Sequence, residues 1–199
     1  MPARPETHRA TTLARREALL EAAAALVAER GVAGVTHREV AARAGVPLST
    51  TSYFFGSIDE LVLEALRHFA AQSIERTNAV TELIAAQRLR PAEAVDALVA
   101  LWESHPPMLV AGQIEAYLEA ARRPEAAEAI HEVIEAFERL AHAGLEACGV
   151  PDLDCLGARA LVALLDGFAL HRVAWPRPDE DRAALKLSLT QSLEAMLAR

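Results

Sequence analysis

The stretch from Thr36 to Asp59 decides the fold, and it reads THREVAARAGVPLSTTSYFFGSID. Thr36 and Glu39 have the spacing of a capping box, in which each side chain accepts a hydrogen bond from a backbone N–H group at a helix start. Gly45 follows where a helix end favours a left-handed residue, and Pro47 suits the first position of a new helix because no N–H partner is needed there. Two short helices joined by a tight turn, a helix-turn-helix, are therefore predicted.

The second short helix, from Leu48 to about Phe54, is rich in hydroxyl groups, which come from Ser49, Thr50, Thr51, Ser52 and Tyr53. Short hydroxyl side chains let a backbone come close to a partner and can hydrogen-bond to phosphates or base edges. We interpret this segment as a recognition helix for the major groove of DNA. The alternative is a polar helix that only faces solvent in an ordinary helical domain.

Two longer helices are predicted to flank the motif. One runs from about Thr12 to Arg30 and ends at Gly31. The other opens at Ser57, where Glu60 completes a second capping box, and neither Gly nor Pro interrupts it before Pro91. This second helix is expected to serve both the motif and the body that follows, and so to link them mechanically.

The segment from about Leu13 to Leu66 resembles the N-terminal domain of TetR-family transcriptional repressors. The matching residues are Leu20, Ala23, Ala24, Leu26, Val27, Glu29, Gly31, Val35, Thr36, Glu39, Val40, Ala41, Ala44, Gly45, Val46, Tyr53, Phe55, Ser57, Glu60 and Leu61. The chain departs from the family at Ile58, where a phosphate-contacting Lys is common, and at Tyr53-Phe54, where Tyr-His or Tyr-Tyr is common. The resemblance implies a dimeric repressor that releases DNA when its helical body binds a small-molecule effector.

The composition favours an all-α protein, because its 52% hydrophobic content consists mostly of Ala and Leu and only 5% of residues are aromatic. We predict a three-helix DNA-binding domain in residues 1–56 and a helical effector-binding and dimerisation domain in residues 57–199. Neither a transmembrane run nor a signal peptide is evident, so a cytoplasmic protein is expected. Cys148 and Cys155 either form a bridge or, as we favour for that compartment, remain free thiols.

The charge is distributed unevenly between these two parts. Residues 1–56 hold seven Arg against five Glu, a net charge of +2, whereas residues 57–199 carry −10 of the total of −8. A basic head suits DNA phosphates, and an acidic body keeps the remainder away from the duplex. The side chains expected to contact DNA are Thr36, His37, Arg38, Pro47, Leu48, Ser49, Thr50, Thr51, Tyr53 and Phe54.

The body reads as helices separated by Pro or Gly, with segments from Pro91 to Pro106, Met108 to about Arg122, Pro124 to near Gly149, about Leu153 to Val173, and about Asp179 to Ala198. The last two are apolar on more than one face, which predicts a homodimer through a four-helix bundle. Its expected interface residues are Leu161, Leu164, Leu165, Phe168, Leu185, Leu189 and Leu193. The alternative is that both faces are buried within one chain.

A small-molecule pocket between helices needs apolar walls and a few orienting polar groups. The candidate lining residues are Trp102, Met108, Gln113, Ile114, Tyr117, His131, Phe137, Phe168 and His171. The identity of the effector is left open by the sequence, although an acidic body favours a neutral or cationic one.

An enzyme is not indicated, because the chain has no Gly-rich phosphate loop, no CxxC pair and no HExxH motif. We expect no catalytic residues, no metal and no cofactor. The predicted function is that of a ligand-responsive repressor that binds a palindromic DNA operator. The alternatives are an activator, or a helical ligand-binding or scaffold protein with little DNA affinity, which would lack the steep salt dependence of DNA binding.

Overall fold

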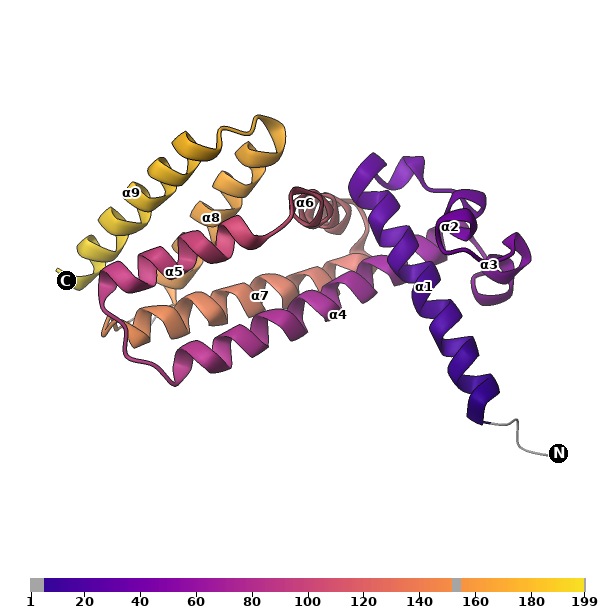
Figure 1. Cartoon of the computed structure of the whole chain (residues 1–199), viewed down its shortest axis with the longest axis horizontal. Helices are drawn as coiled ribbons and strands as arrows, with labels where there is room; N and C mark the ends of the chain where they lie inside the picture. Colours follow the sequence, from indigo (N-terminus) through magenta and orange to yellow (C-terminus); the bar gives the residue numbers. More distant parts are fainter. Residues whose placement is uncertain (1–5, 152–154, 199) are drawn as a thin grey trace. The chain divides into compact units, whose positions relative to one another are not determined.

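A computed structural model describes residues 6–151 and 155–198 of the chain, and the side chains among them from residue 11 onward. In these ranges every regular element is helical, which confirms the all-α prediction (Figure 1). The order is α1 (Glu6–Arg30), η1 (Val32–Gly34), α2 (His37–Arg43), α3 (Leu48–Phe54), α4 (Ile58–Ala85), α5 (Pro91–Ser104), α6 (Pro107–Arg122), α7 (Pro124–Ala147), α8 (Leu156–Ala174) and α9 (Pro178–Leu197). No described helix is both long and apolar enough to cross a membrane.

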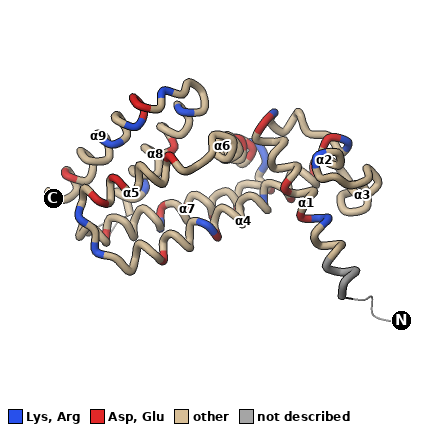
Figure 2. Tube along the Cα trace, in the orientation of Figure 1, with Lys and Arg blue, Asp and Glu red and all other residues tan. Residues whose placement is uncertain are grey.

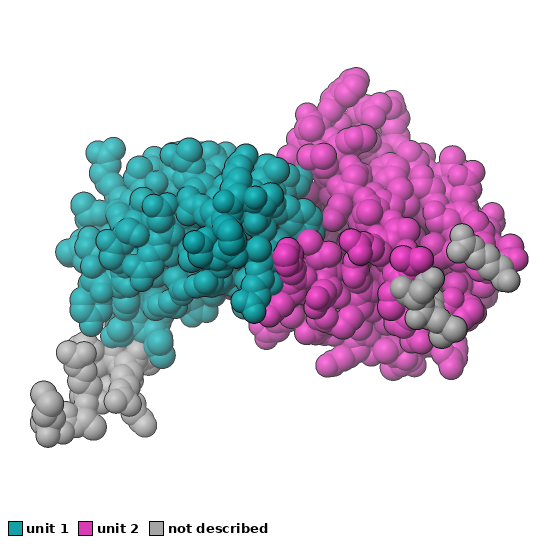
Figure 3. All heavy atoms as spheres, turned by 180° about the vertical axis from the view of Figure 1, so that it is seen from behind, with its two compact units in different colours: residues 1–71, 112–130 teal, residues 72–111, 131–199 magenta. Residues whose placement is uncertain are grey.

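The chain divides into two compact units (Figure 3). Unit 1 comprises the described parts of residues 1–71 together with 112–130, and unit 2 comprises those of 72–111 and 131–199. The unit boundaries therefore fall inside α4, α6 and α7. A division at residue 56 was drawn from the sequence, which gives no sign that a later segment packs with the head.

Unit 1 is built on the apolar face of α1, against which α2 and the first turns of α4 pack. Its fully buried side chains include Leu19, Val27, Val40 and Leu61, and each such burial contributes roughly 1.5–3 kcal/mol. The α6 segment comes very close to α1, because a Cβ atom at Gly112 would lie 3.2 Å from that of Ala28.

Ion pairs add to the packing of unit 1. Arg16 of α1 pairs with Glu64 of α4 at 2.8 Å, and Arg123 pairs with Asp59 at 3.2 Å. The Arg123 pair joins residues 112–130 to the start of α4 within unit 1.

Unit 2 has α9 lying along α5 and α8 (Figure 1). The guanidinium of Arg172 on α8 donates to the carbonyl oxygens of Trp102 at 2.9 Å and His105 at 2.6 Å, and it stacks 4.4 Å from the centre of the Trp102 ring. Burial lowers the pKa of Arg172, although the charges of Glu103 and Asp181 oppose that effect. The end of α5 is thereby tied to α8.

Four of the seven residues expected at a dimer interface lie instead in the core of unit 2: Leu161, Leu185, Leu189 and Leu193. Each is at most 6% exposed, because α9 turns its leucines toward α5 and α8 of the same chain. That part of the expected interface is wrong. Leu164, Leu165 and Phe168 are partly buried beside this core.

Most helix ends fall within a few residues of their predicted positions. The main difference is α1, which begins at Glu6 instead of about Thr12. The predicted long helix from Ser57 also ends at Ala85, before the Pro91 that was expected to stop it.

Candidate DNA-binding motif and ligand cavity

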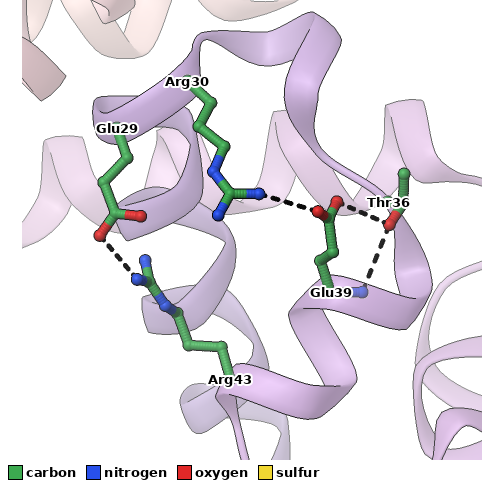
Figure 4. A network of polar contacts seen from close by, with 5 residues as sticks. All are labelled: Glu29, Arg30, Thr36, Glu39 and Arg43. Carbon is green, nitrogen blue, oxygen red and sulfur yellow. Dashed lines mark hydrogen bonds and ion pairs between the residues drawn. The ribbon is translucent and has the colours of Figure 1, made fainter.

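The capping box predicted at Thr36 forms in part. The Thr36 hydroxyl accepts a hydrogen bond from the backbone N–H of Glu39 at 3.3 Å and donates one to the Glu39 carboxylate at 2.9 Å (Figure 4). Thr36 is thus the N-cap of α2, as its spacing from Glu39 predicts. The carboxylate binds the Thr36 side chain instead of its backbone N–H.

A Schellman motif ends α2 and makes the turn of the helix-turn-helix. The N–H of Val46 donates to the carbonyl of Ala41 at 3.0 Å, and that of Gly45 donates to Ala42 at 3.3 Å. Gly45 has a φ of +66°, and a Cβ atom there would meet nothing within 4 Å. Glycine is therefore favoured at position 45 because the backbone has a positive φ there, and not because a side chain would clash with a neighbour. Pro47 is the N-cap of α3, whereas the sequence led us to expect it at the first position inside the helix.

Two ion pairs join α2 to the end of α1 (Figure 4). Arg30 pairs with Glu39 at 2.8 Å and Arg43 with Glu29 at 2.6 Å, so both carboxylates are neutralised. Such exposed pairs add little stability, but they hold the helices in register. Arg38 is exposed, and within the described ranges it makes no ion pair, so its cation is available to a partner.

The outer face of α3 is uncharged and projects large side chains into solvent. Tyr53 is 70% exposed and Leu48 is 51% exposed, while Ser49 and Ser52 are also exposed. Thr50 and Phe54 are partly exposed, and Figure 2 shows no charged residue on this helix. An aromatic and an aliphatic side chain held outward beside small hydroxyls form a surface suited to a binding partner.

Thr51 does not share that outer face. It is fully buried, and its hydroxyl donates to the carbonyl oxygen of Leu48 at 2.8 Å. The expectation that Thr51 contacts DNA does not fit this position, because its side chain packs in the motif's own core. His37 is partly exposed, and its Nδ1 atom is buried without a hydrogen-bond partner among the described residues.

The loop from α3 to α4 is also capped. Ser57 accepts the backbone N–H of Glu60 at 3.1 Å, and the Glu60 carboxylate accepts that of Gly56 at 2.7 Å. Ile58, at the position where the resemblance led us to expect Lys, is the first residue of α4 and is partly exposed. Both hydrogen bonds of the capping box between Ser57 and Glu60 therefore form although residue 58 carries no positive charge.

A cavity of about 340 Å³ that is partly open to solvent lies within unit 2. Its volume is near the lower end of the roughly 300–1,000 Å³ that is usual for small-molecule sites. The walls come from α4, α5, α7, α8 and α9, from Leu89 before α5 and from Cys148 after α7. The lining residues are Val80, Ile84, Leu89, Ala94, Val95, Ala97, Leu98, Leu101, Leu140, Ala141, Gly144, Leu145, Cys148, Leu161, Leu189 and Leu193. The lining contains no charged side chain.

Two segments of the sequence match descriptions of one protein family. Residues 86–199 match "Tetracyclin repressor-like, C-terminal domain", and residues 19–65 match "Bacterial regulatory proteins, tetR family". The chain belongs to the TetR family. Members of this family are transcriptional regulators and not enzymes.

Curated relatives and solved structures agree with this assignment. The HTH-type transcriptional regulator BetI of Agrobacterium fabrum is 30% identical over 160 residues, which cover 79% of this chain and 76% of the relative. BetI of Rhizobium meliloti is 28% identical over 178 residues, covering 87% and 85%.

Two solved structures are similar over most of the chain. A TetR-family member from Streptomyces coelicolor A3 is 31% identical, with a TM-score of 0.68 and coverage of 89% of this chain and 97% of that one. The multidrug binding protein EbrR complexed with imidazole is 31% identical, with a TM-score of 0.65 and coverage of 89% and 94%.

None of the nine residues expected to line an effector pocket lines the cavity of this TetR-family chain. Trp102 is buried under Arg172, Gln113 donates to the Tyr117 hydroxyl at 3.0 Å, and Ile114 is partly buried. Phe137 and Phe168 pack beside the core, whereas Met108, His131 and His171 are exposed.

Small residues line this cavity, whereas the sequence led us to expect aromatic walls. Ala94 and Ala97 on α5 and Ala141 and Gly144 on α7 leave space where larger side chains would fill the core. The sequence signal that was missed is this repeated spacing of three between small residues on helix faces.

Cys148 lines the cavity, and burial raises the pKa of its thiol. Cys155 is exposed and has a φ of +57°. Both are free thiols, as favoured from the sequence.

One group of potential metal ligands was not foreseen. Glu17 and Glu21 of α1 and His68 of α4 place ligand atoms within 4.8 Å of one another. Both carboxylates are exposed, and exposed acidic groups gather in this way without a metal.

Proposed function

We propose that this chain is a ligand-responsive repressor that acts in the cytoplasm and binds a palindromic operator as a homodimer. The outward face of α3 carries the proposal. Tyr53 and Leu48 are exposed on a seven-residue helix without any charge, which follows a capped helix-turn-helix. A major groove offers base edges to the hydroxyls and thymine methyl groups to the apolar atoms.

The proposed contacts come from both helices of the motif. On α3 and its N-cap they are Pro47, Leu48, Ser49, Thr50, Ser52, Tyr53 and Phe54. Around α2 they are Thr36, His37 and Arg38, with Arg38 binding a phosphate. Thr51 supports this surface from below.

A second copy of the chain is proposed to cover one face of α8. Ala160, Ala163, Gly167, Leu170 and Ala174 are all exposed and alternate at spacings of three and four, which places them on one helix face. Small residues there let a partner helix approach closely. Exposed Leu187 continues the apolar surface on α9, so a four-helix bundle of α8 and α9 from two subunits remains the proposed interface.

The effector is proposed to bind in the cavity of unit 2. The structural neighbour EbrR is a multidrug binding protein, which supports a small-molecule role for this part of the fold. An effector that binds one conformation of the body more tightly than another shifts the population toward it. Release of DNA follows if that conformation has the lower affinity for the operator.

A mobility-shift assay with the DNA that flanks the chain's own coding region tests the proposal at two salt concentrations. We expect a sequence-selective shift that weakens steeply with salt. Tyr53→Ala should weaken the shift by the equivalent of about 1–3 kcal/mol while keeping its helical circular dichroism. If neither this DNA nor a selection from random duplexes yields a bound sequence at low salt, the DNA-binding proposal is wrong and a ligand-binding scaffold replaces it.

A further inference from the structure

The walls of the cavity are chemically uniform. They consist of aliphatic side chains, Gly144 and one thiol, that of Cys148. They include no carboxylate, ammonium, guanidinium, amide, hydroxyl or aromatic ring, and the cavity lies entirely within unit 2 of the described chain. The part of a bound molecule that lies between these walls would therefore meet dispersion contacts and almost no hydrogen-bonding partner.

Such a lining discriminates by charge. An ion that enters an apolar site loses its hydration, and only an opposite charge or several hydrogen bonds can offset that cost. An aromatic cation would also find no ring face to stack on. A neutral alkyl group loses nothing comparable and gains from the release of water at its surface.

We propose that the effector of this cavity is a small, neutral, aliphatic molecule whose alkyl part fills the space between α5 and α7. This inference rests on the proposed function in assigning the effector to the cavity of unit 2. The net charge of the body led us to expect a neutral or cationic effector. We now exclude cations, because the acidic residues of the body do not reach the cavity lining. The thiol of Cys148 does not supply a charge either, because burial raises its pKa.

Gly144 gives direct experimental access to the cavity. It lies in α7 and lines the cavity, and a Cβ atom built on it would meet nothing within 4 Å. The first carbon of a side chain at this position therefore meets open space at the cavity wall. Replacement of a helical Gly also raises helix propensity, so the substitution is expected to fold.

The test uses three ligands that share a nine-carbon chain and differ in charge. Calorimetric titration of the full chain at pH 7 with 1-nonanol, nonanoate and nonylamine gives the three dissociation constants in the absence of DNA. We expect 1-nonanol to bind at least about 10-fold more tightly than either ion. Equal or tighter binding of an ion, or no binding of 1-nonanol, overturns the inference. Ethidium, a permanent aromatic cation, is expected not to compete.

Cavity-filling variants tie that binding to this site. Gly144→Leu should weaken 1-nonanol binding at least about 10-fold and raise the melting temperature, whereas Gly144→Ala should change the affinity less than about 3-fold. Ala97→Leu fills the space from α5 and replaces Gly144→Leu should the latter not fold. Unchanged affinity in the filled variant overturns the site.

The result is independent of the DNA-binding proposal. A chain that binds 1-nonanol but no duplex retains the ligand class and loses the repressor function. If the chain shifts DNA but binds nonanoate or nonylamine more tightly than 1-nonanol, the repressor proposal stands and the proposal of a neutral aliphatic effector is wrong.

Discussion

The guanidinium of Arg38 is exposed at the start of α2, and within the described part of the chain it makes no ion pair. If it binds a phosphate, Arg38→Ala removes one released counterion on binding. We expect the slope of log affinity against log salt to fall in magnitude by about 1, with weaker binding to every duplex. Arg88→Ala is the matched control, because it removes an exposed charge from unit 2. Identical slopes for Arg38→Ala and wild type would remove Arg38 from the interface.

Thr51 and Tyr53 are close in sequence and are expected to fail in different ways when replaced. Thr51→Val keeps the buried shape and loses the hydroxyl bonded to Leu48, which should lower the free energy of unfolding by about 0.5–1.5 kcal/mol. Tyr53→Ala should leave that free energy nearly unchanged and weaken operator binding by about 1–3 kcal/mol. Chemical denaturation and mobility shift measure the two quantities. A stable Tyr53→Ala variant with wild-type DNA affinity would contradict the assigned surface.

The thiol of Cys148 should lose its proton at a higher pH in the folded chain than in the unfolded chain. Burial raises the pKa of this thiol in the folded chain, so the folded state favours the protonated thiol. The resulting contribution to the free energy of unfolding is complete below the ordinary cysteine pKa of about 8.5 and is lost as the pH rises through the folded pKa. In a Cys155→Ser variant, alkylation of Cys148 should reach half its maximal rate at a higher pH than in the same chain unfolded by urea. The free energy of unfolding should fall over this alkaline range, and Cys148→Ala should flatten the fall. If alkylation reaches half its maximal rate at the same pH in the folded and the unfolded chain, burial does not desolvate the Cys148 thiol and this prediction is wrong.

Single residues were predictable where chemistry acts locally. Thr36, Ser57 and Gly45 were assigned from spacing because caps and left-handed turns depend on neighbouring backbone atoms. Thr51 was not, because five adjacent hydroxyl residues do not say which of them faces inward on a short helix. Its burial is set by packing against the rest of unit 1.

Among whole elements, the surface of α8 offers the clearest test of assembly. Ala163 lies on the exposed face proposed to meet a second copy. Ala163→Glu would bury an unpaired charge in that interface, so sedimentation should show the 21.4 kDa monomer in place of the dimer. Ala79→Glu is the control, since Ala79 is exposed on α4 with Arg76 one turn before it. A dimeric Ala163→Glu protein would place the interface elsewhere.

Helix ends were predictable to the extent that Pro, Gly or a cap marks them. The starts of α5 and α7 at Pro91 and Pro124 were predicted to the residue, whereas nothing in the sequence marks the start of α1 at Glu6. The faces of α8 and α9 were harder to assign, because both helices carry leucines on several sides. Pattern alone could not tell that Leu185 and Leu189 pack on α5 and leave small residues of α8 outside.

For the molecule as a whole, the sequence predicted the fold class and the helix-turn-helix, but not the cavity. A cavity arises from atoms that are missing, and positions such as Ala141 and Gly144 look ordinary in a helical sequence. Likewise, the association of residues 112–130 with unit 1 depends on contacts between distant segments such as Arg123 and Asp59. Such long-range packing leaves no periodic signal in the chain.

The central claim is that two copies of this chain read a palindrome through α3. Hydroxyl-radical footprinting of the full chain on a selected operator tests it most directly. We expect two protected half-sites whose centres lie about 34–36 Å apart, or 10–10.5 base pairs, and whose protection disappears together in Tyr53→Ala. A single protected site, or a footprint that Tyr53→Ala leaves intact, would contradict the account.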